Sequence, residues 1–174
     1  MRCAHARARA RTWGCEVNRR AAGLAGIVST AAAALLLAFT PSQEGRSLTT
    51  YRDIGGVLTY CDGATENARA DATYTPSECD AQLDRDLARH AAGIARCIPL
   101  ERLTVGQQVA FVDAAYNIGV PAFCGSSMAR LTKAGDIAGA CDALLLWNRA
   151  GGRQVAGLTA RRQRERELCR RGLQ

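Results

Sequence analysis

Histidine is scarce in this 174-residue sequence, and its two histidines leave little scope for a histidine-built metal site. We therefore expect neither a metal nor a cofactor. Glycine follows no fixed period and the hydrophobic fraction of 48% is ordinary, which excludes a collagen-like fibre and a chain disordered throughout. Two full enzyme domains are also excluded, because domains most often contain about 100 to 150 residues. We expect one globular domain with a short extra segment.

Charge is absent from residues 21–40, whose sequence is AAGLAGIVSTAAAALLLAFT. As a helix rising about 1.5 Å per residue, this segment would be about 30 Å long, which is the thickness of a bilayer's hydrocarbon core. Alanine, glycine, serine and threonine dilute its strongly apolar residues, so we expect weak and reversible insertion. Residues 1–20 hold six arginines and one glutamate, a net charge of +5. This excess predicts residues 1–20 in the cytoplasm and residues 41–174 on the far side.

Two other interpretations of residues 21–40 remain open. A cleaved signal peptide also has a basic start and an apolar centre, but it ends in small residues at the −3 and −1 positions. Residues 36–41 read LLAFTP, which is a poor cleavage site. A buried, alanine-rich helix of a cytosolic protein is the second alternative. The arginine-rich flank and the cysteines that follow favour export over both.

The formal charge of +7 is concentrated at the two ends of the chain. Residues 161–171 hold six arginines and two glutamates, a net charge of +4, so the remainder of the chain outside residues 1–20 carries −2. A nucleic-acid binder using the C-terminal arginines is one interpretation, and a solvated helix face is the other. Export disfavours the first, and we expect no nucleic-acid partner.

The eight cysteines contain no C-x-x-C pair, which argues against zinc ribbons and thioredoxin-type sites. Cys3 and Cys15 precede the hydrophobic segment and would stay unpaired in a reducing cytoplasm. Six cysteines follow it, an even number on the oxidising side, and they predict up to three disulfides. Their spacing leaves the connectivity open.

Local patterns predict an α+β fold with a small β-hairpin lobe and a larger helical lobe, preceded by an N-terminal hydrophobic helix. Residues 48–61 resemble a hairpin around Gly55 and Gly56, and residues 62–74 a loop. Capping boxes at 75–78 and 104–107 each open a helix, the second ending near Gly119. Further helices are expected at 126–134, 136–149 and 159–171. A polymeric substrate would lie in a cleft between the lobes.

Glu44, Asp53 and Thr59 surround the expected hairpin. Hydrolysis of a glycosidic bond needs one carboxylic acid to protonate the leaving oxygen and a second carboxylate to act on water or on the sugar cation. A two-residue loop at Gly55 and Gly56 would turn Thr59 to the opposite face from Asp53, whereas a four-residue loop over 53–56 would pair Thr50 with Thr59 and leave Asp53 free to turn toward it. The catalytic interpretation therefore requires the longer loop.

Taken singly, each of these three residues has an ordinary structural interpretation. Glu44 fits a surface or helix-start carboxylate, Asp53 a turn former, and Thr59 a strand residue. Their combination and spacing carry the functional hypothesis.

At these positions the chain resembles the phage-type lysozymes of glycoside hydrolase family 24, the endolysins. Their signature of Glu, eight residues, Asp, five residues, Thr is matched by Glu44, Asp53 and Thr59. The resemblance continues through YRDIGGVLT (51–59), YTPSEC (74–79), AYNIG (115–119), GDIAGACDALLLW (135–147) and GL (157–158). It is closest to the signal-anchor-release endolysins, whose weakly hydrophobic N-terminal segment first tethers the enzyme and later leaves the bilayer.

The resemblance implies three parts: a basic cytoplasmic N-terminus (1–20), a signal-anchor segment (21–40) and a lysozyme catalytic domain (41–174). It implies cleavage of the β-1,4 bond between N-acetylmuramic acid and N-acetylglucosamine in peptidoglycan, leading to host cell lysis. Glu44 would be the general acid, and Asp53 with Thr59 would position the attacking water. The family is regarded as inverting, which calls for carboxyl groups about 6.5 to 9.5 Å apart. The enzyme would be a monomer, tethered to the inner membrane facing the periplasm and then released.

The sequence departs from the family after Thr59. Relatives usually have a stretch containing glycine and histidine there, whereas this chain reads CDGAT at 61–65, which removes a local support of the cleft. Residues 21–40 also lack the cysteine with which some relatives release the active site by thiol exchange.

Two kinds of further site residue follow. Asn117 and Arg162 are candidates for substrate contact, with helix capping and a surface charge as their alternatives. We predict disulfides Cys61–Cys79 and Cys141–Cys169, with Cys97 and Cys124 as the remaining pair. The first would fasten the hairpin to the helix that follows it, because Cys61 lies two residues after Thr59.

A non-catalytic, membrane-tethered peptidoglycan-binding module is the alternative function.

Overall fold

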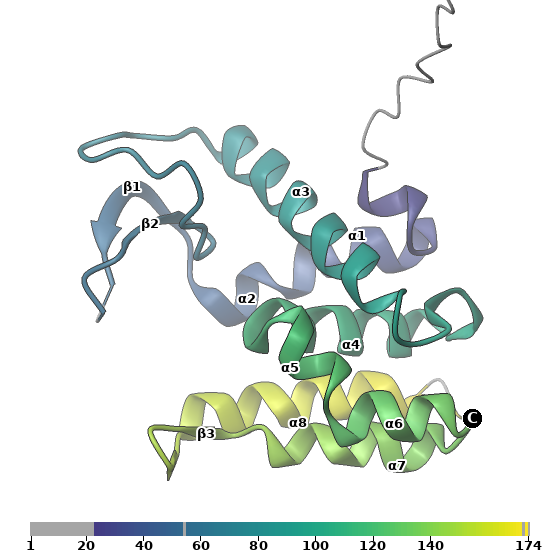
Figure 1. The fold of residues 1–174 in the computed structure, drawn as a ribbon. Helices are drawn as coiled ribbons and strands as arrows, with labels where there is room; N and C mark the ends of the chain where they lie inside the picture. The colour runs from purple at the N-terminus through teal and green to yellow at the C-terminus, as the bar shows by residue number, and fades with distance from the viewer. Residues whose placement is uncertain (1–22, 54, 172, 174) are drawn as a thin grey trace, which may run out of the picture.

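The computed structural model describes residues 23–53, 55–171 and 173. The expected cytoplasmic segment 1–20, with Cys3 and Cys15, therefore lies outside the described residues, as do residues 21 and 22. A small hairpin lobe and a larger helical lobe are both present, as expected, and helix α3 runs between them (Figure 1).

The N-terminal segment is broken into short pieces that pack into the core. Residues Leu24–Gly26 form the 3-10 helix η1, and helix α1 covers Thr30–Phe39, capped by the side chain of Ser29. Leu24 and Leu36 have no exposed surface. The hydrophobic helix expected over residues 21–40 is thus not confirmed, and no helix among the described residues is long and apolar enough to span a bilayer.

The first hairpin has a register that differs from both expected alternatives. Strand β1 (Ser47–Arg52) pairs with strand β2 (Leu58–Cys61), placing Tyr51 opposite Thr59. The predicted pairing of Thr50 with Thr59 is wrong, because the loop spans five residues, 53–57. Asp53 causes this closure: its backbone N–H donates to the Val57 carbonyl (3.0 Å), and its carboxylate accepts from the Val57 N–H (2.8 Å).

Both predicted capping boxes are confirmed. The Thr75 box opens helix α3 (Pro76–Ile94), and the Thr104 box opens helix α4 (Val105–Ile118), which ends at Gly119. The other elements before the C-terminal region are α2 (Pro41–Glu44), η2 (Leu100–Arg102), α5 (Val120–Cys124) and α6 (Ser127–Lys133).

The C-terminal region departs from the expected helix boundaries. The helix expected over 136–149 ends early as α7 (Ile137–Ala143) and η3 (Leu144–Leu146). A second hairpin follows, made of β3 (Arg149–Ala150) and β4 (Arg153–Gln154), because Gly151 and Gly152 adopt positive φ and reverse the chain. Helix α8 (Ala156–Arg171) starts three residues before the expected position, so Thr159 lies within it rather than capping it.

Helix α4 is the centre of the fold. Its residues 107–115 are all buried, as expected of a helix surrounded by others. It packs against α1, α3, α5 and α8, so segments from both ends of the chain meet on it. Figure 1 shows α8 beside α6 and α7 as a layer below α4.

The three predicted disulfides are confirmed. Cys61–Cys79 joins β2 to α3, Cys97–Cys124 joins the chain after α3 to α5, and Cys141–Cys169 joins α7 to α8. They close loops of 18, 27 and 28 residues, for which chain-entropy arguments give about 3 to 4 kcal/mol each. The first bridge fastens the small hairpin lobe to α3, and the other two lie within the helical lobe.

Gly106 allows the close approach of α4 and α8. A Cβ atom at this position would lie 2.2 Å from the backbone carbonyl oxygen of Leu168. We predict that Gly106→Ala lowers the free energy of unfolding by about 1 to 3 kcal/mol, because the helices must separate to accept the methyl group. Urea denaturation followed by circular dichroism measures this.

Gly157→Ala is the matched control, since Gly157 lies in α8 and a methyl group there would have no neighbouring atom within 4 Å. The better helix propensity of alanine should leave the control as stable as the parent or slightly more so. Equal stability of both variants would contradict the close packing of α4 on α8.

Candidate active site

Glu44 is the last residue of the short helix α2, at the point where the chain turns into the hairpin. Pro41 starts this helix, and Gly45 ends it with φ of +75°, a conformation that glycine adopts without strain. The side chain of Glu44 is 23% exposed. Its position after a helix and before a strand places the carboxyl group at the boundary between the two lobes.

A cleft of about 280 Å³ lies beside Glu44. Its walls come from α2, from the loop after β2, from α3 and from the C-terminal end of α4. The lining residues are Glu44, Asp62, Gly63, Ala64, Thr65, Glu66, Asp86, Arg89, His90, Tyr116 and Asn117. Four of these side chains are acidic, so the cleft presents hydrogen-bond acceptors and carboxyl groups to whatever enters it.

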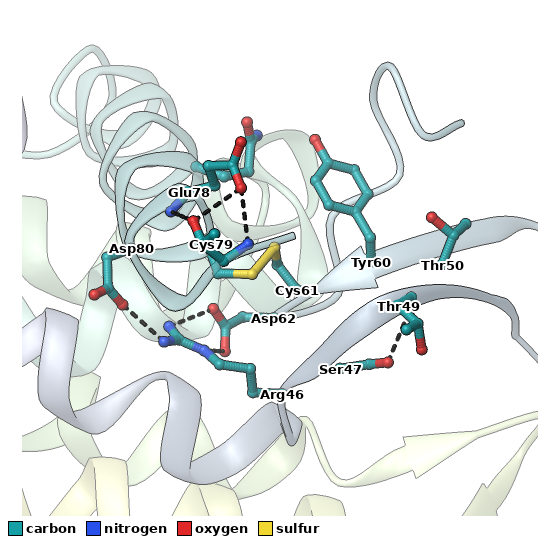
Figure 2. Close-up of a disulfide and its surroundings, with 12 residues drawn as sticks. Arg46, Ser47, Thr49, Thr50, Tyr60, Cys61, Asp62, Glu78, Cys79 and Asp80 are labelled. Atoms are coloured by element: carbon teal, nitrogen blue, oxygen red, sulfur yellow. Dashed lines mark hydrogen bonds and ion pairs between the residues drawn. A yellow bond between two sulfur atoms is a disulfide. The ribbon is translucent and has the colours of Figure 1, made fainter. Parts of the chain in front are cut away.

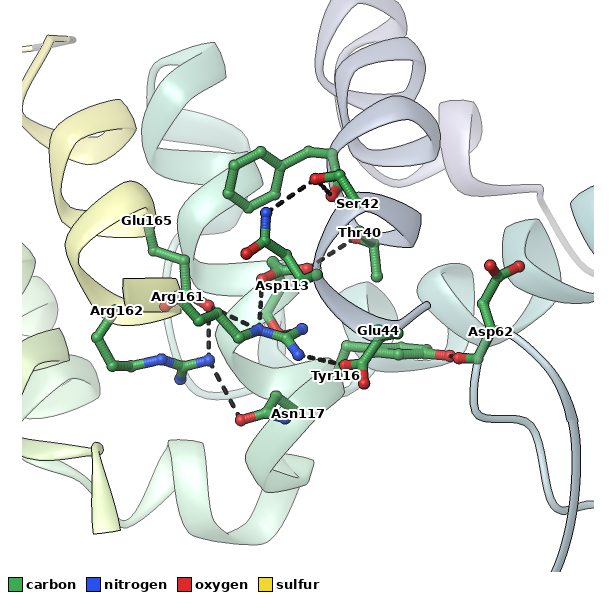
Figure 3. A network of polar contacts seen from close by, with 12 residues as sticks. Thr40, Ser42, Glu44, Asp62, Asp113, Tyr116, Asn117, Arg161, Arg162 and Glu165 are labelled. Atoms are coloured by element: carbon green, nitrogen blue, oxygen red, sulfur yellow. Dashed lines mark hydrogen bonds and ion pairs between the residues drawn. The ribbon is translucent and has the colours of Figure 1, made fainter. Parts of the chain in front are cut away.

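Arg161 connects Glu44 to the core (Figure 3). Its Nη1 contacts the Glu44 carboxylate, and its Nε donates to Asp113 Oδ2 at 3.0 Å. Asp113 is fully buried and also accepts a hydrogen bond from the Thr40 hydroxyl at 2.8 Å. The carboxyl group of Glu44 is therefore held from α8 through a guanidinium that α4 keeps in place.

Burial by itself would lower the pKa of the Arg161 guanidinium. The charges of Asp113 and Glu44 outweigh burial and raise its pKa instead. Arg161 consequently stays charged at any pH at which the protein is folded, and it is a permanent hydrogen-bond donor to Glu44.

Behind Arg161 lies a second buried pair, Arg162 and Glu165. Glu165 Oε1 lies 2.6 Å from Arg162 Nη2 and 3.3 Å from Arg161 Nε. Burial raises the pKa of Glu165 well above its ordinary value, and burial lowers the pKa of Arg162. Each of the two guanidiniums therefore has a carboxyl partner at close range behind the cleft.

Asp53 and Thr59 lie on the hairpin and both bond to Val57. The Asp53 carboxylate accepts from the Val57 N–H, and the Thr59 hydroxyl donates to the Val57 carbonyl at 3.1 Å. Asp53 is exposed and Thr59 is buried. Neither residue is among the described residues that line the cleft. Their catalytic roles stay a prediction.

Asn117 and Arg162 are brought together. Asn117 lines the cleft near Tyr116, and its side-chain oxygen accepts from Arg162 Nη2 at 3.2 Å. Arg162 has no exposed surface, so it is neither the surface charge nor an open substrate contact in this structure. It lies behind Asn117 and orients that amide toward the cleft.

Sequence reasoning missed Thr40, Asp113 and Arg161, which hold Glu44. A signal existed for Asp113, because it is the only charged residue in the otherwise apolar and amide-bearing run QQVAFVDAAYN. Carboxylates are rarely buried unless paired, so such a residue predicts a buried partner. Nothing local identifies that partner as Arg161, which lies 48 residues further along the chain.

The arrangement suits general acid catalysis. A carboxyl group that lines a cleft, with its side chain held in one place, can deliver a proton to a bound leaving group when it is protonated. The amide of Asn117 and the loop over 62–66 offer further polar contacts along the same cleft. A chain of sugars, rich in hydroxyl and amide groups, fits such a lining.

Comparison with known proteins agrees with this geometry. The family described as Phage lysozyme matches residues 41–165. The SAR-endolysins of Enterobacteria phages PA-2 and P21 are 43% and 42% identical to the chain, each over 72% of it and 76% of the relative. The active form of the P1 phage endolysin Lyz has a similar fold, with a TM-score of 0.74, 22% identity, and coverage of 85% of this chain and 87% of that one. The chain therefore belongs to the phage lysozyme family and is a glycoside hydrolase of the lysozyme type.

Proposed function

We propose that the protein is an endolysin that hydrolyses the β-1,4 bond between N-acetylmuramic acid and N-acetylglucosamine in peptidoglycan and so lyses the host cell. The position of Glu44 carries the proposal: its carboxyl group lines the cleft while Arg161 holds it from behind. Glu44 protonates the leaving oxygen, and Asp53 with Thr59 positions the attacking water, in the inverting manner. Asn117 contacts the glycan strand, and the enzyme acts as a monomer.

Two SAR-endolysins of similar sequence support the idea that residues 21–40 act as a releasable anchor. Residues 1–20 stay in the cytoplasm, and residues 41–174 face the periplasm. After release, the segment leaves the lipid and packs against the rest of the protein. Its apolar residues Leu24, Ala32 and Leu36 lie fully buried in the core. The segment therefore has a hydrophobic environment in both states.

The two polar ends of α1 also have partners in the folded domain. The backbone N–H and the hydroxyl of Ser29 both donate to Gln108 Oε1, at 3.0 and 3.1 Å. Thr40 donates to Asp113, which holds Arg161. Departure of the segment from the bilayer thus supplies a hydrogen bond to the residues that fix Glu44, and the anchored enzyme lacks it.

Replacement of the acid tests the chemistry. We predict that Glu44→Gln lowers the release of reducing ends from purified peptidoglycan by about a hundred- to ten-thousand-fold, because the amide cannot donate the catalytic proton. Circular dichroism should show that the variant is folded. Glu101→Gln, at an exposed position, is the matched control and should keep full activity.

Full activity of Glu44→Gln would refute the assignment of the acid. The alternative, a non-catalytic module that only binds peptidoglycan, requires that the parent protein itself releases no reducing ends while still sedimenting with the sacculus.

Replacement of Thr40 tests the link between the segment and the site. We predict that Thr40→Val lowers the free energy of unfolding by about 1.5 to 3 kcal/mol, because Asp113 loses a donor in a fully buried position. Thr30→Val, the same substitution at the exposed start of α1, should change it by less than about 0.5 kcal/mol. Thermal unfolding of both proteins measures the difference, and equal effects would contradict the proposed link.

A more hydrophobic anchor tests release. We predict that Gly23→Leu with Gly26→Leu keeps the protein in the membrane fraction and delays lysis, because leucine favours bilayer insertion. Fractionation of induced cells over time measures the two forms. Serine at the same two positions is the control and should not delay lysis. Unchanged release in the leucine variant would count against a reversible anchor.

A further inference from the structure

Asp62, the residue directly after β2, is a buried carboxylate that the chemistry above does not use. Its side chain is 2% exposed. Both of its oxygens accept hydrogen bonds from one guanidinium, that of Arg46, with Nε at 3.0 Å from Oδ1 and Nη2 at 2.8 Å from Oδ2. Two parallel charge-assisted bonds of this kind fix distance and direction together. Hydrogen bonding to Asp62 also raises the pKa of Arg46, so the Arg46 guanidinium stays charged.

Asp62 joins three walls of the cleft, two of them drawn in Figure 2 and the third, α4, in Figure 3. Arg46 belongs to the turn between α2 and β1, and its Nη1 reaches Asp80 of α3 at 2.8 Å. The backbone carbonyl of Asp62 accepts a hydrogen bond from the Tyr116 hydroxyl of α4 at 2.7 Å. Burial raises the pKa of Tyr116, which keeps this hydroxyl protonated as a donor. Asp62 thus bonds to the α2–β1 turn through its side chain and to α4 through its backbone. Among the described residues that line the cleft, no other makes both contacts.

The backbone just before Asp62 is held in an unusual conformation. Cys61 has φ of +52°, in the left-handed region that non-glycine residues rarely adopt. Its disulfide to Cys79 of α3 fixes it there. The strand thus ends in a sharp turn that points the Asp62 carboxylate at Arg46 and its carbonyl at Tyr116, as Figure 2 shows for the carboxylate.

Glu44 depends on this turn because only Gly45 separates it from Arg46. Gly45 has φ of +75° and no side chain, so it makes no side-chain contact that would hold the turn in place. Arg161 holds the carboxyl group of Glu44 from α8, and Arg46 holds the following backbone from the hairpin lobe. The two contacts come from different elements, α8 and the loop after β2.

We propose that Asp62 is a positioning residue for Glu44: by binding Arg46 it fixes the α2–β1 turn against the hairpin lobe, so that the Glu44 carboxyl group faces the bound glycan. The proposal rests on the proposed role of Glu44 as the acid. Asp62 itself is not a second catalytic carboxylate, because both of its oxygens are bound to Arg46.

A set of three variants separates positioning from plain stability. Arg46→Ala leaves Asp62 as a buried, unpaired carboxylate and should lower the melting temperature most, whereas Asp62→Ala and the double variant leave no buried charge unpaired. We expect all three to lower kcat about 10- to 100-fold with less than a twofold change in KM, because misplacement of a catalytic group by about 1 Å has effects of this size. The double variant should recover melting temperature but not kcat.

Asp142→Ala is the matched control. Asp142 is also a carboxylate bound by arginines, Arg166 at 2.6 Å and Arg170 at 2.8 Å, but it lies in α7, outside the cleft. Its kcat should match that of the parent. Recovery of kcat together with melting temperature in the double variant would show a merely structural role and overturn the proposal.

Amide hydrogen exchange gives a readout that does not depend on activity. We expect the amides of residues 44–46 to exchange at least tenfold faster in Asp62→Ala, with those of α4 unchanged. Unchanged exchange at 44–46 would overturn the proposal. If exchange rises but the parent enzyme cleaves no glycan, the proposed function fails while the positioning of the turn by Asp62 stands.

Discussion

The buried guanidinium of Arg161 is the constraint on which the rest of the site depends. A charge removed from water must be neutralised by partners at close range, and here the carboxylates come from α2, α4 and α8. Loss of one partner from such a cluster typically costs about 3 to 5 kcal/mol, because the others are left uncompensated. The need to satisfy Arg161 therefore fixes the positions of three helices and brings Glu44 to the boundary between the lobes.

The hairpin lobe provides the opposite constraint on Glu44. Its hydrophobic cluster is small, made of Tyr60, Cys61, Ala64 and Cys79, and cannot hold the strands in place by burial alone. A disulfide and the bonds of Arg46 with Asp62 fasten it to α3 and to the α2–β1 turn. The carboxyl group of Glu44 thus lies between the large helical lobe and a small lobe that is held by covalent and ionic links.

In the proposed anchor-release cycle, the composition of the N-terminal segment has to suit two environments. Small residues such as Ala32 and Ala33 let α1 approach α4 closely, and the same residues weaken its preference for a bilayer. Ser29 and Thr40 reduce its hydropathy, and both meet buried acceptors of α4 in the folded domain. Polar residues weaken this segment as a membrane span. In the folded domain, the same polar residues find hydrogen-bond partners in the core.

Features that depend on near neighbours in the chain can be predicted from the sequence. The capping boxes at Thr75 and Thr104 form their hydrogen bonds within three residues, and both predicted helices begin there. The family spacing of Glu44, Asp53 and Thr59 is likewise visible in the sequence, whereas the cysteine spacing leaves the disulfide connectivity open. The five-residue loop closed by Asp53 and the second hairpin at Gly151 and Gly152 are also local, but the expected loop and helix lengths missed them. Only the tertiary structure gives the partners of Glu44. The physical reason is distance along the chain: Arg161 follows Glu44 by 117 residues, and only the packing of α8 on α4 brings their charges together.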